Sequence, residues 1–335
     1  MSEAPHKKPN PNRPVPLDFE LELAKLEDRI EEMREWAREN QKAAEEQNIE
    51  NEISRLQAKA MEMRVSIFSN LTRWQRVQVA RHRDRPYTLD YIGMIMDDWM
   101  ELHGDRAFAD DPAMVSGIAK FRGRSVAVVG QQKGRSLEDK LRRNWGMAGP
   151  EGYRKAMRIM KLAEKFRMPV ISIVDTPGAA PGIGAEERGQ AEAIARNLFD
   201  MSVLRTPIVI AVVGEGASGG ALGIGVGDRV LMQENCWYSV ISPEGCAQIL
   251  WRTAEAKEQA AEAMKVSAQD LKEFGLIDEV VREPLGGAHH NPREAASILA
   301  DRLDYHIAQV ETLPIRELLA QRRAKLYSFG VWDEA

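Results

Sequence analysis

Backbone N–H groups in two glycine-rich loops are the best candidates for chemistry in this chain. The loops span residues 175–184 and 214–220, and each follows a short apolar run. Gly219 and Gly220 stand where a helix is predicted to begin, so their N–H groups would be among the donors that a helix leaves unsatisfied at its start. Such donors can stabilise negative charge on a reacting oxygen. Alternatively, the glycines only permit a tight turn and close packing.

Neither loop carries a nucleotide-binding motif. The glycines of the first loop do not follow the G-x-G-x-x-G pattern that opens directly into a helix, and the chain has no G-x-x-x-x-G-K-[ST] string. The segment 175–178 is similar to the magnesium segment of GTPases, but no phosphate-binding loop precedes it. Nucleotide hydrolysis is therefore not expected.

Ser218 could act as a nucleophile, because a serine in a glycine-rich turn often carries an acyl-transferring hydroxyl. The base that it would need is not evident, since none of the distant histidines lies in a motif that identifies it. His289 and His290 are adjacent in a predicted loop, where they are expected to point to opposite sides of an extended chain and lack the spacing of further ligands. We therefore expect neither serine-peptidase chemistry nor a metal site.

Carboxylates close to the loops could supply a general acid and base, as a hydratase would need. These residues are Glu186, Glu187, Glu215 and Glu244. Each could equally be a solvent-facing side chain or a carboxylate at a helix terminus, where the helix dipole favours it.

The apolar runs before the loops predict buried parallel strands. Residues 169–174 and 207–213 are short, continuous and bounded by proline and glycine. A helical pattern follows each loop, which predicts strand–loop–helix units joined by right-handed crossovers in one sheet. Both loops then emerge at the carboxyl edge of the sheet, where a site would form.

Four regions are predicted along the chain. Residues 1–16 contain five prolines and are expected to form a disordered tail. Residues 17–80 carry two apolar stripes at helical spacing and are expected to form a helical extension, either one bent helix or a hairpin. The main domain is placed at 81–312, and residues 313–335 are predicted to be an exposed helix and a tail.

Shorter elements are predicted inside the main domain. Residues 116–130 have the pattern of a two-stranded hairpin, and further short strands are predicted at 229–232 and 237–241. Ser242 is a plausible N-cap, with Pro243 in the first turn of the helix that follows.

The polar segment 131–147 contains several basic residues. These are Lys133, Arg135, Arg142 and Arg143. The segment is either a solvated loop that leads to the helix near Pro150 or a binding element.

Composition limits the class of protein. A chain of 335 residues with 44% hydrophobic residues can bury a full core, and its formal net charge of -5 argues against a general affinity for nucleic acid or an anionic membrane. No apolar run is long enough to predict a membrane-spanning helix, and the N-terminus lacks an apolar signal core, so a cytoplasmic location is expected. Cys236 and Cys246 are too few for a disulfide framework or a four-thiolate zinc site, and free thiols are expected.

Further motifs accompany the two loops. They are His103-Gly104-Asp105-Arg106, Gln132-Lys133-Gly134-Arg135, Arg142-Arg143-Asn144, Pro150-Glu151-Gly152-Tyr153, Glu186-Glu187-Arg188-Gly189-Gln190, Ser242-Pro243-Glu244-Gly245 and Pro284-Leu285-Gly286-Gly287-Ala288-His289. With the loops, they make residues 17–320 similar to the alpha subunits of the carboxyltransferase of multi-subunit acetyl-CoA carboxylase. Small departures occur at Ala180, Ala217, Gln131 and Trp237, where that family commonly has tyrosine, glycine, histidine and threonine. They leave the reaction class intact, but the family's details of the biotin pocket's walls are not carried over to these positions.

The resemblance implies a crotonase-like α/β fold, a spiral of ββα units, with an N-terminal helical extension. It also implies that the carboxyl group of carboxybiotin, delivered by the biotin carboxyl carrier protein, passes to acetyl-CoA to form malonyl-CoA in the first step of fatty acid synthesis. A carboxyltransferase beta subunit with its own zinc would complete an α2β2 heterotetramer, and biotin carboxylase would belong to the larger complex. No cofactor would be bound covalently in this chain.

The resemblance also implies roles for particular residues. The N–H groups of Gly219 and Gly220 would face the ureido oxygen of biotin, and no protein base would be required. The biotin side would be shaped by Gly178, Ala179, Pro181, Gly182 and Ser218. The four basic residues of the segment 131–147 would contact CoA phosphates or the partner subunit. The alternatives are a stand-alone enoyl-CoA hydratase or isomerase of the crotonase type, or a non-catalytic assembly subunit.

Overall fold

The computed structural model describes residues 13–41 and 48–330. The prediction of disorder for residues 1–12 and the prediction of a tail at residues 331–335 therefore concern residues outside the described part. The α-helices are α1 (Leu21–Glu39), α3 (Ile49–Ser69), α4 (Arg73–Ala80), α5 (Thr88–Ile95), α6 (Leu137–Arg142), α7 (Pro150–Phe166), α8 (Ile183–Glu187), α9 (Gln190–Val203), α10 (Ser218–Leu222), α11 (Pro243–Leu250), α12 (Lys257–Met264), α13 (Ala268–Glu273), α14 (Pro292–Glu311) and α15 (Ile315–Tyr327). The short 3-10 helices of the described residues are η1 (Asp18–Glu20), η2 (Asn144–Gly146) and η3 (Ala254–Ala256). The strands are β1 (Asp97–Glu101), β2 (Met114–Phe121), β3 (Arg124–Gln131), β4 (Val170–Thr176), β5 (Ile208–Ala217), β6 (Arg229–Gln233), β7 (Trp237–Ser239) and β8 (Glu279–Val281).

One mixed sheet organises the main body. Its strand order is β1-β2-β3-β4-β5-β6-β8, with β7 paired beside the end of β5. The pairs β1–β2 and β2–β3 are antiparallel, and the pairs from β3 onward are parallel. The predicted hairpin at 116–130 is therefore confirmed as β2 and β3, and the two runs before the glycine loops are confirmed as the adjacent parallel strands β4 and β5.

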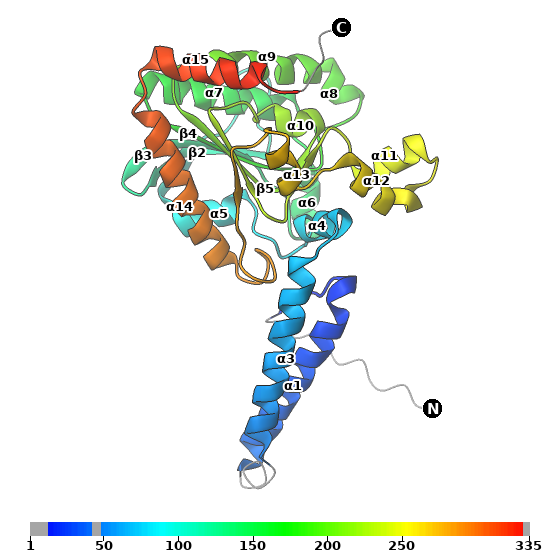
Figure 1. The fold of residues 1–335 in the computed structure, drawn as a ribbon. Coiled ribbons are helices and arrows are strands. Elements are labelled where there is room, and N and C mark those ends of the chain that lie inside the picture. The colour runs from blue at the N-terminus through cyan, green and yellow to red at the C-terminus, as the bar shows by residue number, and fades with distance from the viewer. Residues whose placement is uncertain (1–12, 42–47, 331–335) are drawn as a thin grey trace.

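Helices cover both faces of the sheet, which explains why its central strands β4 and β5 are buried along their whole length (Figure 1). Val170 and Val174 of β4 belong to a core with α7 and α9, whereas Ile171 and Ile173 belong to a second core with α5 and α14. Alternate residues of a strand face opposite sides, so both sets must be apolar. Because β4 and β5 are parallel neighbours, the glycine loops that follow them emerge at the same edge.

The helical extension is a hairpin that projects from the body (Figure 1). Apolar residues of α1 and α3 pack against each other in a core of their own. The buried members of that core are Leu23, Ile30, Ile53, Leu56 and Ala60. Of the two arrangements that the sequence left open, the hairpin is the one found.

The segment 13–16 packs against its neighbours, so the expectation of disorder is wrong for these four residues. Nη1 of Arg13 donates a hydrogen bond to Oδ1 of Asp28 in α1 at 2.9 Å. The carbonyl oxygen of Val15 lies 2.7 Å from Nε2 of the buried His82. Prolines prevent a helix here, but an extended chain can still hydrogen bond through its remaining backbone groups.

Two further expectations need correction. The segment 131–147 is not all loop, because it contains α6, whose six residues are too few to show an apolar stripe. The C-terminal helix α15 is not simply exposed, since Arg322 is 1% exposed and forms an ion pair with Asp228 at 2.7 Å. Among the described residues, no helix is long and apolar enough to cross a membrane.

The start of α11 provides a test of local stability. As predicted, Ser242 caps this helix, and its Oγ accepts a hydrogen bond from the N–H of Gly245 at 3.1 Å. We expect Ser242→Ala to lower the free energy of unfolding by about 1 kcal/mol, because an N–H in the first turn loses its partner. Ser242→Asp retains an acceptor and should stay within about 0.5 kcal/mol of the wild type. Urea unfolding midpoints compare the two, and equal losses would contradict the capping role.

Candidate active site

The two glycine loops touch at Gly220. A Cβ atom on Gly220 would lie 2.3 Å from the carbonyl carbon of Gly178 and 2.6 Å from the backbone nitrogen of Ala179. Only glycine permits this approach, since both neighbouring atoms belong to the backbone and cannot rotate away. The loops after β4 and β5 therefore form one continuous wall.

The turn from β5 into α10 presents the candidate amides. Ser218 begins α10 with φ 57°, a left-handed conformation that is uncommon for a residue other than glycine. Its side chain is exposed, Gly219 is half-buried and Gly220 is buried. Gly219 and Gly220 lie in the first turn of α10, where N–H groups have no carbonyl partner within the helix.

Gln131 joins the two loops through its side-chain amide. Its Nε2 donates to the carbonyl oxygen of Gly220 at 2.9 Å, and its Oε1 accepts from the N–H of Asp175 at 3.1 Å. Gln131 is fully buried at the end of β3. The hydroxyl of Tyr153 also donates to the carbonyl oxygen of Gly220, at 3.3 Å. The peptide groups at the start of α10 are thus held from two sides.

The first loop is fixed by backbone and hydroxyl contacts. Oγ1 of Thr176 accepts from the N–H of Gly178 at 3.1 Å and lies 2.7 Å from the carbonyl oxygen of Gly146. The N–H of Ala180 donates to Ala148 at 2.9 Å. Gly178 has φ 152°, within the range that favours glycine. This wall is therefore positioned before any ligand arrives.

A lysine whose side chain is only 12% exposed lies between carboxylates from both loops. Nζ of Lys133 is 2.7 Å from Oδ1 of Asp175 and 2.7 Å from Oε1 of Glu215. Burial alone would lower the pKa of Lys133, but these two carboxylates raise it above its ordinary value. Oδ1 of Asp175 also accepts from the N–H of Glu215 at 3.0 Å. Lys133 is thus a charged link between the segments that carry the two glycine loops.

Arg81 extends this network toward α11. It forms ion pairs with Glu215 at 2.7 Å and with Glu244 at 2.5 Å, and its guanidinium lies 5.3 Å from the ring centre of Trp237. Although burial would raise the pKa of Glu215, Lys133 and Arg81 hold it below its ordinary value. Glu215 and Glu244 are therefore ionised partners of cations.

Comparison with known proteins gives the family. Residues 16–330 match the family model described as "Acetyl co-enzyme A carboxylase carboxyltransferase-like". Acetyl-coenzyme A carboxylase carboxyl transferase subunit alpha of Methylococcus capsulatus is 54% identical over 95% of this chain and 98% of that protein. The protein of the same name from Thioalkalivibrio sulfidiphilus is 55% identical, with the same coverage. The chain belongs to this family of alpha subunits.

Solved structures confirm the crotonase-type fold of this alpha subunit. A Pseudomonas malonate decarboxylase hetero-tetramer with coenzyme A matches with TM-score 0.53 and 18% identity, over 63% of this chain and 85% of that chain. The beta subunit of geranyl-CoA carboxylase from P. aeruginosa matches with TM-score 0.52 and 17% identity, over 79% of this chain and 48% of that chain. The predicted fold class and family resemblance are both confirmed.

The structure does not gather the four basic residues of the alpha subunit into one free patch. Lys133 is enclosed as described, and Arg143 donates to Asp139 and to the carbonyl oxygen of Pro112, each at 2.9 Å. Arg135 pairs with Asp90, and Arg142 pairs with Asp139 at 3.0 Å. The side chains of Arg135 and Arg142 are about half exposed.

The nucleophile hypothesis for Ser218 has no support in the described residues. The five described histidines have other neighbours: His103 is near Asp110, His306 is near Glu279, and His82, His289 and His290 lie in one cluster. No hydrogen bond joins any of them to Ser218 in that part of the chain. Glu186 and Glu187 are exposed in α8.

Sequence reasoning missed Gln131, Arg81 and Tyr153 as positioning residues. Their contacts to Gly220 or Glu215 span 67 to 134 positions, so no local spacing could reveal them. Gln131 offered one signal, since it is a polar residue at the end of an apolar run that was predicted to be a buried strand.

Proposed function

We propose that this alpha subunit supplies the biotin side of a carboxyltransferase that forms malonyl-CoA from acetyl-CoA and carboxybiotin. The close contact between Gly220 and the segment Gly178–Ala179 is the observation that supports it most strongly. This contact makes one pre-formed wall, with the N–H groups of Gly219 and Gly220 in the first turn of α10. Donors fixed in this way can hold negative charge on the ureido oxygen without reorganising during the reaction.

The other loop residues shape this wall. Gly178 and Ala179 contact Gly220, whereas Pro181, Gly182 and Ser218 are exposed at its rim. No side chain of this subunit needs to remove the proton from the methyl group of acetyl-CoA. Carboxybiotin supplies the carboxyl group, and the biotin that remains after its release acts as the base. The subunit binds and orients carboxybiotin and stabilises negative charge on its ureido oxygen.

The proposed partners are the carboxyltransferase beta subunit in an α2β2 heterotetramer, the biotin carboxyl carrier protein, and biotin carboxylase in the larger complex. Exposed apolar side chains in the first glycine loop, after β7 and in α11 support a partner surface. They are Ile183 in α8, Val240 after β7, and Ile249 and Leu250 in α11, all at least 67% exposed. Zinc is assigned to the beta subunit, and Arg135 and Arg142 are proposed to contact CoA phosphates or that partner.

The hydratase alternative is not favoured by Glu215 and Glu244. A general acid needs a raised pKa, whereas cations lower the pKa of both Glu215 and Glu244. If the chain were only an assembly subunit, the wall would not contribute to catalysis. An assay of malonyl-CoA formation by the reconstituted subunits tests this alternative.

The test is reconstitution of the full chain with its beta partner. We expect malonyl-CoA formation from acetyl-CoA and carboxybiotin only when both subunits are present, because each is proposed to hold one substrate. The full chain alone should not hydrate crotonyl-CoA. Hydration by the lone chain would favour the hydratase alternative, and full carboxyl transfer by the partner alone would favour the assembly subunit.

A further inference from the structure

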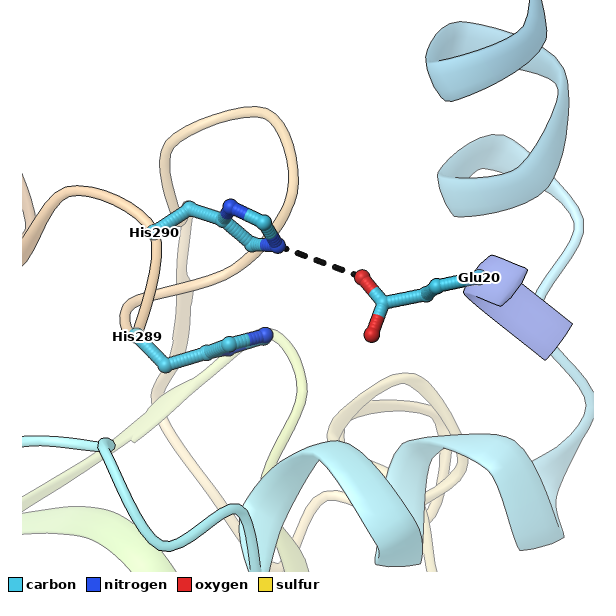
Figure 2. Close-up of side chains that lie close together, drawn as sticks. All are labelled: Glu20, His289 and His290. Atoms are coloured by element: carbon cyan, nitrogen blue, oxygen red, sulfur yellow. Dashed lines mark hydrogen bonds and ion pairs between the residues drawn. The ribbon is translucent and has the colours of Figure 1, made fainter. Parts of the chain in front are cut away.

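A cluster of two histidines and a glutamate lies where the N-terminal segment meets the loop before α14 (Figure 2). Nε2 of His290 is 3.2 Å from Oε1 of Glu20, which ends η1. The rings of His289 and His290 lie 4.5 Å apart between centroids. One ligand atom from each of the three residues lies within 4.8 Å of the others.

The loop geometry overturns the expectation that the adjacent histidines diverge. Gly286 and Gly287 have φ of 99° and 89°, and the N–H of His290 donates to the carbonyl oxygen of Gly287 at 3.1 Å. The chain therefore turns instead of extending. In a turn, consecutive side chains need not alternate between opposite faces, and here both rings approach Glu20 (Figure 2).

His289 has an unmet need for a partner. His289 is only 3% exposed, and neither of its ring nitrogens forms a hydrogen bond in the described part of the chain. A buried polar atom without a partner is unfavourable and calls for a specific explanation. Here an unpartnered nitrogen lies beside a carboxylate and a second imidazole.

The distances suit a metal ion with tetrahedral ligands. Zinc bonds to nitrogen and oxygen are about 2.0–2.1 Å, which separates two ligand atoms of a tetrahedron by about 3.3 Å. The 3.2 Å between His290 and Glu20 matches that separation. The third ligand atom, from His289, lies within 4.8 Å of the other two, so it must move closer to them to complete a tetrahedral set.

The surroundings prepare His289 as a ligand. His82 stacks on it, with 4.1 Å between ring centroids and 27° between planes. Both ring nitrogens of His289 lack a hydrogen-bond partner among the described residues, so either can bind a cation. A pocket lined by Glu20 and His290, together with Arg13, Glu27 and Asp28, opens beside two of the three residues.

We propose that Glu20, His289 and His290 bind a zinc-type divalent cation through one carboxylate oxygen and two imidazole nitrogens. The fourth position is left to water, as in other three-ligand zinc sites. The ion ties η1, at the base of the projecting hairpin, to the loop before α14. This assignment does not depend on the carboxyltransferase proposal.

Cobalt titration of the full chain, purified alone and treated with EDTA, tests the site. We expect one equivalent of Co²⁺ to bind with the absorption bands of a tetrahedral complex, and Zn²⁺ to displace it. Glu20→Gln and His290→Gln should each weaken binding at least tenfold, because each removes a ligand. Zn²⁺ should raise the melting temperature of the wild type but not of these variants.

Matched controls separate this cluster from other metal-binding groups. His103→Gln removes an exposed histidine that lies near Asp110, outside the cluster, and should leave cobalt binding unchanged. Cys246→Ser removes a partly exposed thiol and should also leave it unchanged. The proposal is overturned if the wild type binds no stoichiometric cobalt, if the two ligand variants bind as tightly as the wild type, or if either control abolishes binding.

Discussion

Gly220→Ala is expected to reduce malonyl-CoA formation by about 10²–10³-fold in the reconstituted enzyme. The new Cβ would lie 2.3 Å from the carbonyl carbon of Gly178, so the two loops would have to separate. Separation moves the N–H groups at the start of α10 away from the wall to which we assign charge stabilisation. The loss should appear mainly in kcat, with KM for acetyl-CoA little changed, because the partner is proposed to hold that substrate.

Gly219→Ala is the matched control for this substitution. A Cβ on Gly219 meets only Ile194, at an ordinary contact distance of 3.4 Å, and the N–H group is retained. We expect activity within about twofold of the wild type, since an alanine in this position neither displaces the loop nor removes a donor. Near-native activity of a folded, assembled Gly220→Ala enzyme would contradict the proposed wall.

The strands and loops of the site could be predicted because their evidence is local in the sequence. Apolar runs ending in glycine predicted β4 and β5, and the parallel arrangement followed from the helices after them. The Ser242 cap was also predicted, because a cap depends only on residues three positions apart. Local chemistry therefore accounts for where the loops begin and why they share an edge.

Contacts between distant residues could not be predicted in the same way. Lys133 was read as part of a basic segment, but its partners Asp175 and Glu215 are 42 and 82 positions away. Glu20 and His290 are 270 positions apart, so the spacing of the histidines gave no third ligand. Charge patterns show which residues need partners, and only the fold shows where those partners are.

Lys133→Met is expected to lower the free energy of unfolding by about 3–5 kcal/mol, which is typical when one partner of a buried ion pair is removed. Methionine nearly fills the space of the lysine stem, but Asp175 and Glu215 would lose the cation between them. Arg142→Ala should change stability by no more than about 0.5 kcal/mol, because that side chain is 57% exposed and pairs with Asp139 near the surface. Chemical denaturation at neutral pH compares the two.

The pH dependence of the free energy of unfolding shows whether Lys133→Met acts through lost charge or through lost packing. In the wild type, Lys133 and Arg81 hold the pKa of Glu215 below its ordinary value. Ionised Glu215 therefore stabilises the fold fully at a pH above its ordinary pKa. This stabilisation is lost as the pH falls through the lower pKa of the folded state. Burial already raises the pKa of Asp175 in the wild type, and without Lys133 it should raise the pKa of Asp175 further and that of Glu215 above its ordinary value. Protonation then stabilises the variant. The stability gap between wild type and Lys133→Met should therefore narrow between about pH 7 and pH 4. A gap independent of pH would mean that the lysine acts only through packing, and the link between the two loops would not be electrostatic.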